Sequence, residues 1–157
     1  MCGSGDRRVQ IVGGAADEFG FHARVYIGDF DVKTRLDALD LSDGYSEAGL
    51  MARADRSSGA LFAAVLASPS LGGIKFQSRS NAATAADSTG SMPVNYPYTW
   101  LRLQRTGKVF AGFGSLDGQT WQRLGTAPLD MPATVYVGFA VDSHQSAVAA
   151  TARFREP

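Results

Sequence analysis

Cysteine is nearly absent from this sequence, because Cys2 is the only one among 157 residues. A single cysteine cannot form an internal disulfide, which excludes a small scaffold held together by disulfides. The two histidines, His22 and His144, stand far apart in the sequence and are too few, with one cysteine, for a zinc site. They also offer no local nucleophile–base pair. The sequence therefore predicts no cofactor and a fold stabilised by its hydrophobic core alone.

An excess of charge of one sign is also missing. Fifteen basic residues balance fifteen acidic ones, so the formal net charge is zero and no global field attracts a polyanion. We expect no nucleic-acid partner. No apolar run approaches the roughly 18 residues of a membrane span, and the opening residues MCGSGDRRVQ lack the apolar region of a signal peptide. We therefore expect no membrane span and no signal peptide in this chain.

Paired carboxylates of the kind used by glycosidases are lacking as well. The only glutamates are Glu18, Glu47 and Glu156, and none has a second carboxylate two residues away on the same strand face. A sugar-cleaving site needs two carboxylates on either side of the scissile bond, so the sequence predicts that the protein is not an enzyme. Asp29 and Asp31 do share a strand face. They are either two solvated acids at a strand start or, as the alternative, ligands of a structural calcium ion.

What the sequence does contain is strand periodicity, and it is clearest from Trp100 to Trp121. Large apolar residues alternate with polar or small ones on both sides of Thr106-Gly107, and Asp117-Gly118 follows. Alternation with period two indicates strands with one buried face, and such dipeptides favour tight turns. We expect two hairpins, with Asp117 bonded to its own backbone downstream and Trp121 in the core.

The same pattern, punctuated by turn residues, runs through the whole chain and predicts an all-β protein. We expect residues 1–8 to be a flexible lead-in, residues 9–157 to form one domain, and Asn81–Pro97 to be a long loop. The predicted strands are Val9–Val12, Phe19–Ile27, Phe30–Leu39, Ser46–Arg53, Leu61–Leu66, Ile74–Arg79, Tyr98–Gln104, Val109–Gly114, Thr120–Leu124, Thr134–Val141 and Val148–Phe154.

Four segments resemble the concanavalin A-like, or laminin-G-like, domains related to the DUF1349 type. They read GDFDVKTRLDALD, EAGLMARADRSSGA, WLRLQRTGKVFAGFGSLDGQTWQRLG and MPATVYVGFAVDSH. The resemblance implies a jelly-roll β-sandwich of two antiparallel sheets, one of them concave. It also implies a non-catalytic accessory module of a secreted or cell-surface bacterial protein, hence an extracellular or surface location. Because one fold serves many functions, the activity follows less firmly than the fold.

A candidate binding surface comes from the strand residues that alternate with the expected core positions. If their strands share the concave sheet, these residues line one groove that could bind a glycan or a peptide. Its guanidinium, amide and aromatic groups suit sugar hydroxyls and ring faces. The alternative is a solvated outer face whose arginines pair with Glu47 and Asp142. The candidate residues are Glu47, Met51, Arg53, Gln77, Arg79, Trp100, Arg102, Tyr136 and His144.

A second candidate function concerns the start of the chain. Compared with the domains it resembles, the chain has a shortened first strand, Val9–Val12. We expect this to leave Val148–Phe154, or its neighbour, with unpaired backbone groups at a sheet edge. Such an edge can accept a strand from another copy or from a neighbouring domain. The alternative to a glycan-binding module is therefore a structural module that assembles through a sheet edge.

Overall fold

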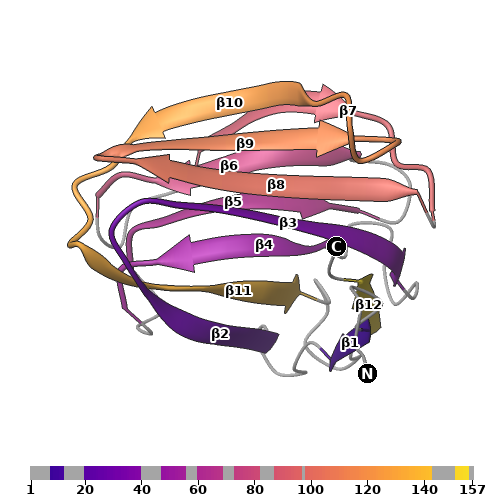
Figure 1. The fold of residues 1–157 in the computed structure, drawn as a ribbon, viewed down its shortest axis with the longest axis horizontal. Coiled ribbons are helices and arrows are strands. Elements are labelled where there is room, and N and C mark those ends of the chain that lie inside the picture. Colours follow the sequence, from indigo (N-terminus) through magenta and orange to yellow (C-terminus); the bar gives the residue numbers. More distant parts are fainter. Residues whose placement is uncertain are drawn as a thin grey trace.

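The computed structural model describes residues 8–12, 20–39, 47–55, 60–68, 73–81, 87–96, 98–142 and 151–155. In this part of the chain every regular element is a β-strand, and all strand pairs are antiparallel. The strands form two six-stranded sheets packed as a sandwich (Figure 1). The predicted jelly-roll β-sandwich is confirmed.

The sheets are named here by their strands in spatial order. Sheet I consists of β1 (Arg8–Val12), β12 (Thr151–Arg155), β3 (Phe30–Leu39), β8 (Thr99–Thr106), β9 (Val109–Ser115) and β10 (Gln122–Pro128). Sheet II consists of β2 (Gly20–Ile27), β11 (Thr134–Asp142), β4 (Glu47–Arg53), β5 (Phe62–Ala67), β6 (Ile74–Arg79) and β7 (Asp87–Met92).

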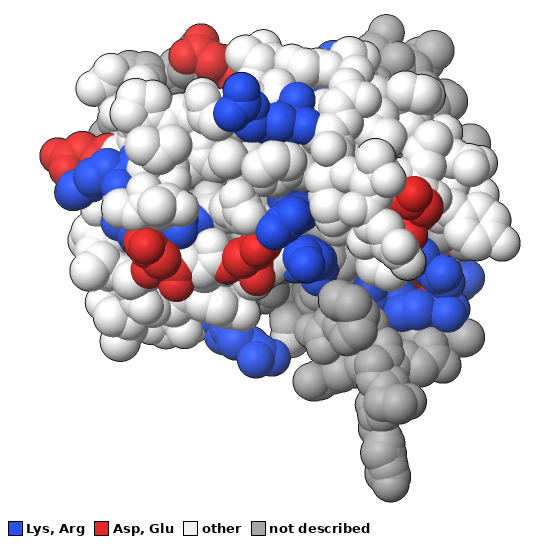
Figure 2. All heavy atoms as spheres, turned by 45° about the horizontal axis from the view of Figure 1, so that its top comes forward, with Lys and Arg blue, Asp and Glu red and all other residues white. Residues whose placement is uncertain are grey.

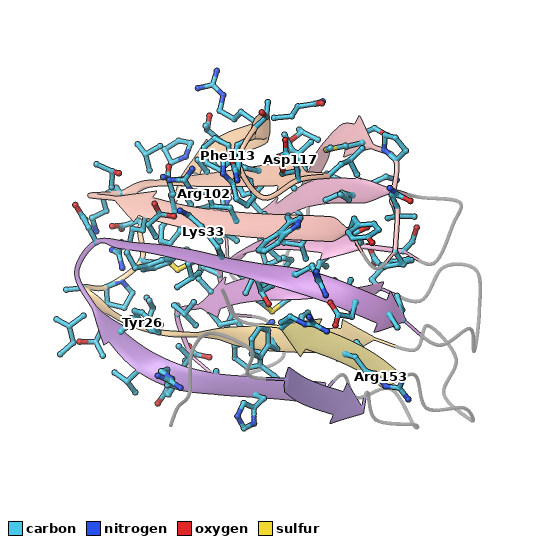
Figure 3. All side chains as sticks on the ribbon, turned by 45° about the vertical axis from the view of Figure 1, so that its right-hand side comes forward. Tyr26, Lys33, Arg102, Phe113, Asp117 and Arg153 are labelled. Carbon is cyan, nitrogen blue, oxygen red and sulfur yellow. The ribbon has the colours of Figure 1, made fainter. Side chains whose placement is uncertain are left out.

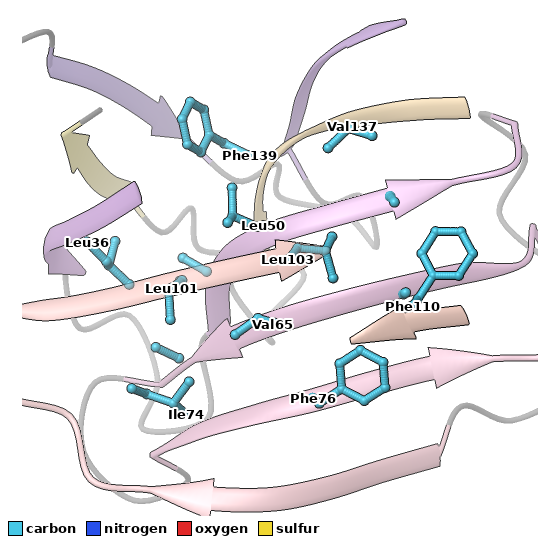
Figure 4. Close-up of a cluster of buried hydrophobic side chains, with 14 of the residues drawn as sticks. Leu36, Leu50, Val65, Ile74, Phe76, Leu101, Leu103, Phe110, Val137 and Phe139 are labelled. Atoms are coloured by element: carbon cyan, nitrogen blue, oxygen red, sulfur yellow. The ribbon is translucent and has the colours of Figure 1, made fainter. Parts of the chain in front are cut away.

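The core lies between the two sheets and is built from alternate residues of each strand. Phe76 and Val65 of sheet II face Leu103 and Phe110 of sheet I, and all four are buried (Figure 4). Gly112 lies between them, where a Cβ atom would come within 2.4 Å of the Phe76 ring. Burial of such side chains is the main stabilising contribution to a sandwich without disulfides.

Each predicted strand overlaps an observed one, and the structure adds β7. The expected long loop Asn81–Pro97 is therefore wrong in its middle. Asp87–Met92 pairs with β6, and its first five residues are exposed. An edge strand with solvated side chains needs no apolar face, so its sequence shows no alternation. Arg8, which we placed in the flexible lead-in, is the first residue of β1.

The expected edge at the last strand is also wrong. The backbone of β12 pairs with β3 on one side and, from Thr151 to Arg155, with all of β1 on the other. Five residues of β1 cover five residues of β12, so a short first strand is long enough. The sheet ends are instead β1 and β10 in sheet I, and β2 and β7 in sheet II. Residues 148–150 lie outside the described part.

The first predicted hairpin is confirmed. Thr106 pairs with Val109, and Gly107 and Lys108 form the two-residue turn, with Gly107 at a φ of +61°. A positive φ favours glycine. Arg105 is buried and donates hydrogen bonds to the carbonyls of Gly107, Met131 and Pro132 at 2.7–3.0 Å, which fixes this end of the sandwich.

Candidate functional site

A row of four side chains crosses the outer face of sheet II. Each member is directly opposite the next in register, and the row lies on the strand faces that point away from the core. Residues opposite each other on antiparallel strands are close enough for their side chains to touch. Across β11, β4, β5 and β6, this arginine row consists of Tyr136, Arg53, Phe62 and Arg79.

The Phe62 ring is flanked by two guanidinium groups. The Cζ atoms of Arg79 and Arg53 lie 5.0 and 5.8 Å from the ring centroid, within the range of cation–π attraction. Arg79 also donates from Nη1 to the carbonyl of Ala60 at 3.1 Å. These contacts hold two guanidinium groups at fixed places beside one ring, although their like charges repel each other.

Arg53 is the most buried charged group in the row. Only 3% of its surface is exposed, and its Nε donates to the carbonyl of Asp55 at 3.3 Å while Nη1 lies 3.6 Å from Met51 Sδ. Its pKa is lowered first by burial and then by the charge of Arg79, and the charge of Asp55 opposes this shift. The group is positioned by its neighbours and is not a solvated surface arginine.

The neighbouring part of this outer face is apolar. Beside Phe62, a cluster of buried residues lies on the side away from the main core, and Phe21 packs against it. Its further members are Met51, Ala64, Leu66 and Ala140. Gln77, which is half-buried, donates from Nε2 to Glu47 Oε2 at 2.9 Å. The face therefore combines an apolar floor, two guanidinium groups and a fixed amide–carboxylate pair.

The single groove expected from the sequence is not present. The outer face of sheet II carries six of the candidates, namely Glu47, Met51, Arg53, Gln77, Arg79 and Tyr136. Trp100 and Arg102 are on β8, which belongs to sheet I. His144 lies outside the described residues. Alternation shows which face of a strand points outward, but it does not show which sheet the strand joins.

Arg102 is held on the outer face of sheet I by a carboxylate and two aromatic rings. Its Nε and Nη2 donate to the two oxygens of Asp31 at 2.8 and 2.6 Å, and Gln104 Nε2 donates to Asp31 at 3.1 Å. Arg102 Cζ is 5.4 Å from the ring centroids of both Phe113 and Trp121 (Figure 3). These bonds lower the pKa of Asp31, mainly through Arg102, and raise that of Arg102.

The residues between β9 and β10 fold over this same face. Gly118 has a φ of +76°, and a Cβ atom there would lie 2.8 Å from the Trp100 ring. Ser115 Oγ accepts hydrogen bonds from the backbone N–H groups of Asp117 and Gly118. The loop thus covers Trp100, and a side chain at position 118 would displace it.

Asp117 ties this loop to itself, as the sequence predicts. Its Oδ1 accepts from the backbone N–H groups of Gln119 and Thr120 at 2.8 Å, and Ser115 Oγ donates to the same oxygen at 2.8 Å. The bonds from Thr120, Gln119 and Ser115 lower the pKa of Asp117 to about 2. The turn is longer than the expected two-residue hairpin, because β9 ends at Ser115 and β10 begins at Gln122.

Trp121 is not in the core, which corrects the expectation from its alternating neighbours. It is half-buried and lies beside Arg102 on the outer face of sheet I. Trp121 is the last residue of a six-residue loop, and the register between β9 and β10 then shifts within β10, between Arg123 and Gly125. Leu124, three residues later, is the buried residue that points into the core.

The acidic pair considered for calcium is occupied by other partners. Asp31 binds Arg102, and Asp29 Oδ1 accepts from the backbone N–H of Gly107 at 2.8 Å. Among the described residues, no group of three or more His, Cys, Asp or Glu side chains could hold a metal ion. Glu18 and Glu156 lie outside the described residues. No helix in the described part could cross a membrane.

The sequence analysis missed three side chains that shape these faces. Phe62 belongs to FAAVLA, which is buried on both faces, so alternation could not separate its core side from its outer side. Phe113 was visible only as an alternating strand residue, and Asp31 only as a solvated acid or a calcium ligand. Their partners come from other strands, and the pairing of β3, β8 and β9 brings them together.

Comparisons with known proteins support the fold. No family model matches the sequence, and no curated protein matches it either. Among solved structures, a functionally unknown protein from Saccharomyces cerevisiae is similar over 99% of this chain and 88% of its own. The TM-score is 0.72 and the identity 19%. Carbohydrate binding module CBM66 from Bacillus subtilis matches over 91% and 81% of the two chains, with TM-score 0.57 and 20% identity.

A third similar structure is much longer than this chain. The GH43 protein BlXynB from Bacillus licheniformis matches over 94% of this chain but only 32% of its own length, with TM-score 0.64 and 15% identity. At these identities the likeness concerns the fold alone. The sandwich is thus shared with a carbohydrate-binding module and with part of a GH43 protein. The closer assignment to laminin-G-like or DUF1349-type domains stays a prediction.

Proposed function

We propose that this protein is a non-catalytic accessory module that binds a glycan on the outer face of sheet II. The observation that carries the proposal is the placement of Arg53 and Arg79 around the Phe62 ring. A guanidinium has five N–H donors, so it can hold a backbone carbonyl and a sugar hydroxyl together. The fold likeness to CBM66 supports this reading, as does the GH43 likeness.

The groups around the arginine row suit a sugar in a specific way. Met51 and Leu66, each 7% exposed, form the apolar floor beneath the site, and the half-buried Tyr136 ring can receive the C–H face of a pyranose or furanose ring. Gln77, also half-buried, stands at the border of the site as a hydrogen-bonding group. Such a module would belong to a secreted or cell-surface protein, where its partner would be a surface or extracellular polymer.

The test uses an array of defined oligosaccharides, followed by calorimetry with an oligosaccharide that binds. We expect Arg79→Ala and Gln77→Ala each to weaken binding by at least about tenfold, since each removes a polar contact. Gln104→Ala is the matched control, because Gln104 is a half-buried strand glutamine on the other sheet. Binding that survives both sheet II changes, or absence of any bound sugar, would contradict the proposal.

A second candidate function is assembly, and a different observation favours it. β2 lies at the end of sheet II, and on its outer side Val25 and Ile27 are 54% and 77% exposed. An apolar edge strand can pair with a second copy of the chain. Light scattering at high concentration tests this: a dimer that Ile27→Lys returns to monomer supports assembly, and a wild-type monomer excludes it.

A further inference from the structure

Charge is unevenly distributed over the molecule, although its formal sum is zero. The described strand residues on the outer face of sheet I include many more cations than anions. Figure 2 shows basic groups near the middle of one face, with acidic groups beside them. The cations are Lys33, Arg35, Arg102, Arg123, Arg153 and Arg155, and the anions on these strands are Asp31 and Asp37.

Three of the basic residues lie in a line across the sheet. Lys33, Arg102, Phe113 and Arg123 are successive register partners on β3, β8, β9 and β10. Three strand spacings of about 4.8 Å separate Lys33 from Arg123, so the line is roughly 14 Å long. Lys33 and, on β12, Arg153 are exposed (Figure 3). Arg123 is exposed as well.

The middle of this line already holds a carboxylate. Arg102 donates two hydrogen bonds to the two oxygens of Asp31, and Gln104 donates a third. Asp37 is held in a similar way between Arg35 at 2.7 Å and Arg155 at 3.0 Å. The spacing of donors on this face therefore fits carboxylate groups, which a guanidinium binds with two parallel N–H donors.

Trp100, Phe113 and Trp121 on the same face are covered by other parts of the molecule, whereas Tyr98, beside Arg35, is 54% exposed. Arg102 lies over Phe113 and Trp121, and Gly118 lies against Trp100. Proteins that bind single-stranded nucleic acid stack bases on open ring faces. Along the line from Lys33 to Arg123, this face instead offers fixed positive charges without open rings, which favours a polyanion whose charged groups are carboxylates.

We propose that the outer face of sheet I binds a linear carboxylated polysaccharide through the line from Lys33 to Arg123. Each carboxylate of the polymer would take the role that Asp31 plays for Arg102. This site lies on the opposite sheet from the glycan site proposed above and does not depend on it.

The test measures binding of polygalacturonate by affinity electrophoresis at pH 7 and low salt. Lys33→Glu and Arg123→Glu should each weaken binding by at least about tenfold, because reversing a charge replaces attraction with repulsion. Arg24→Glu is the matched control: it changes net charge equally, but Arg24 is exposed on β2 of sheet II. Circular dichroism checks that all three variants fold. Asp31→Asn should strengthen binding, because it releases Arg102 from its internal carboxylate.

Two further probes test whether binding needs the charge of the polymer and whether it is independent of the glycan site on sheet II. Fully methyl-esterified polygalacturonate has the same chain without charge and should not bind. Arg79→Ala, on sheet II, should leave polygalacturonate binding unchanged even if it abolishes binding of an array sugar. The proposal is overturned if wild-type protein does not bind, if Arg24→Glu weakens binding as much as Lys33→Glu, or if duplex DNA competes as well as polygalacturonate does.

Discussion

The two outer faces of this sandwich belong to different sheets. In both sheets, residues alternate along the strands between the core and the outside, but the two faces differ in character. On sheet II, outward-pointing residues such as Phe62, Leu66 and Arg53 are buried. On sheet I, outward-pointing Lys33 and Arg123 are exposed, and the rings between them are half-buried. Pointing away from the core is therefore not the same as facing solvent. Among the described residues, a second, smaller apolar cluster stabilises the outer face of sheet II and not that of sheet I.

The largest effect should come from removing the two phenylalanines that hold these faces. Phe62→Ala should lower the free energy of unfolding by about 3–5 kcal/mol, because a buried ring leaves a cavity. Phe113→Ala should cost less than half as much, since Phe113 is half-exposed under Arg102. Urea unfolding measures both. Equal losses would mean that the two faces are equally packed and would remove the contrast.

Arg53 should behave as a packed side chain whose charge is dispensable for stability. Arg53→Ala should cost about 2 kcal/mol through lost contacts with Phe62 and Met51. Arg53→Met keeps most of the volume without a buried charge, and it should be about as stable as wild type. Thermal unfolding of both variants checks this. A loss in Arg53→Met as large as in Arg53→Ala would show that the charge itself stabilises sheet II.

The loop over sheet I should be sensitive to acid. The hydrogen bonds within the loop lower the pKa of Asp117 to about 2 from its usual 3.8. A lowered carboxyl pKa stabilises the closed loop above pH 3.8, and this contribution is lost as the pH falls from 3.8 to about 2. Tryptophan fluorescence should change over that interval, because Gly118 covers Trp100 and Trp121 ends the loop.

Two variants control that titration. Asp117→Asn has no carboxylate at the turn and should lose the fluorescence change. Asp87→Asn removes an exposed carboxylate from β7 of sheet II and should keep it. If both variants titrate like the wild type, the change reports another group and not this loop.

The smallest effects should come from exposed ion pairs. Asp31→Asn breaks a pair whose side chains are 20% and 39% exposed, and should cost about 0–1 kcal/mol. Asp130→Asn breaks the Lys108 pair, whose side chains are 60% and 93% exposed, and should cost close to nothing. Chemical denaturation ranks them. A larger loss for Asp130→Asn would contradict the link between exposure and contribution.

The local sequence pattern was sufficient to predict every strand except β7, and to predict the hydrogen-bonding role of Asp117 in its turn. Alternation from Trp100 to Gln104 separates buried Leu101 and Leu103 from their outward neighbours, and Asp117 bonds to the backbone just after it. Both depend on residues within a few positions of each other, so the sequence by itself determines them. The sequence pattern could not reveal β7, because the side chains of an exposed edge strand need not alternate between apolar and polar.

Which strands share a sheet was decided only by the tertiary structure. The candidate groove failed because β8, which carries Trp100 and Arg102, pairs with β3 and β9 and not with any strand of sheet II. Likewise, β1 covers β12 although nothing near either strand encodes that pairing. Strand pairing depends on how two apolar faces close over one core, and the paired strands can lie far apart in the sequence, as Arg8 and Arg155 do. The sequence by itself therefore determined that this protein is a β-sandwich and which residues of its alternating strands point inward. The burial of Arg53 and the position of Trp121 were decided only by the tertiary structure, because they depend on contacts between distant strands and loops.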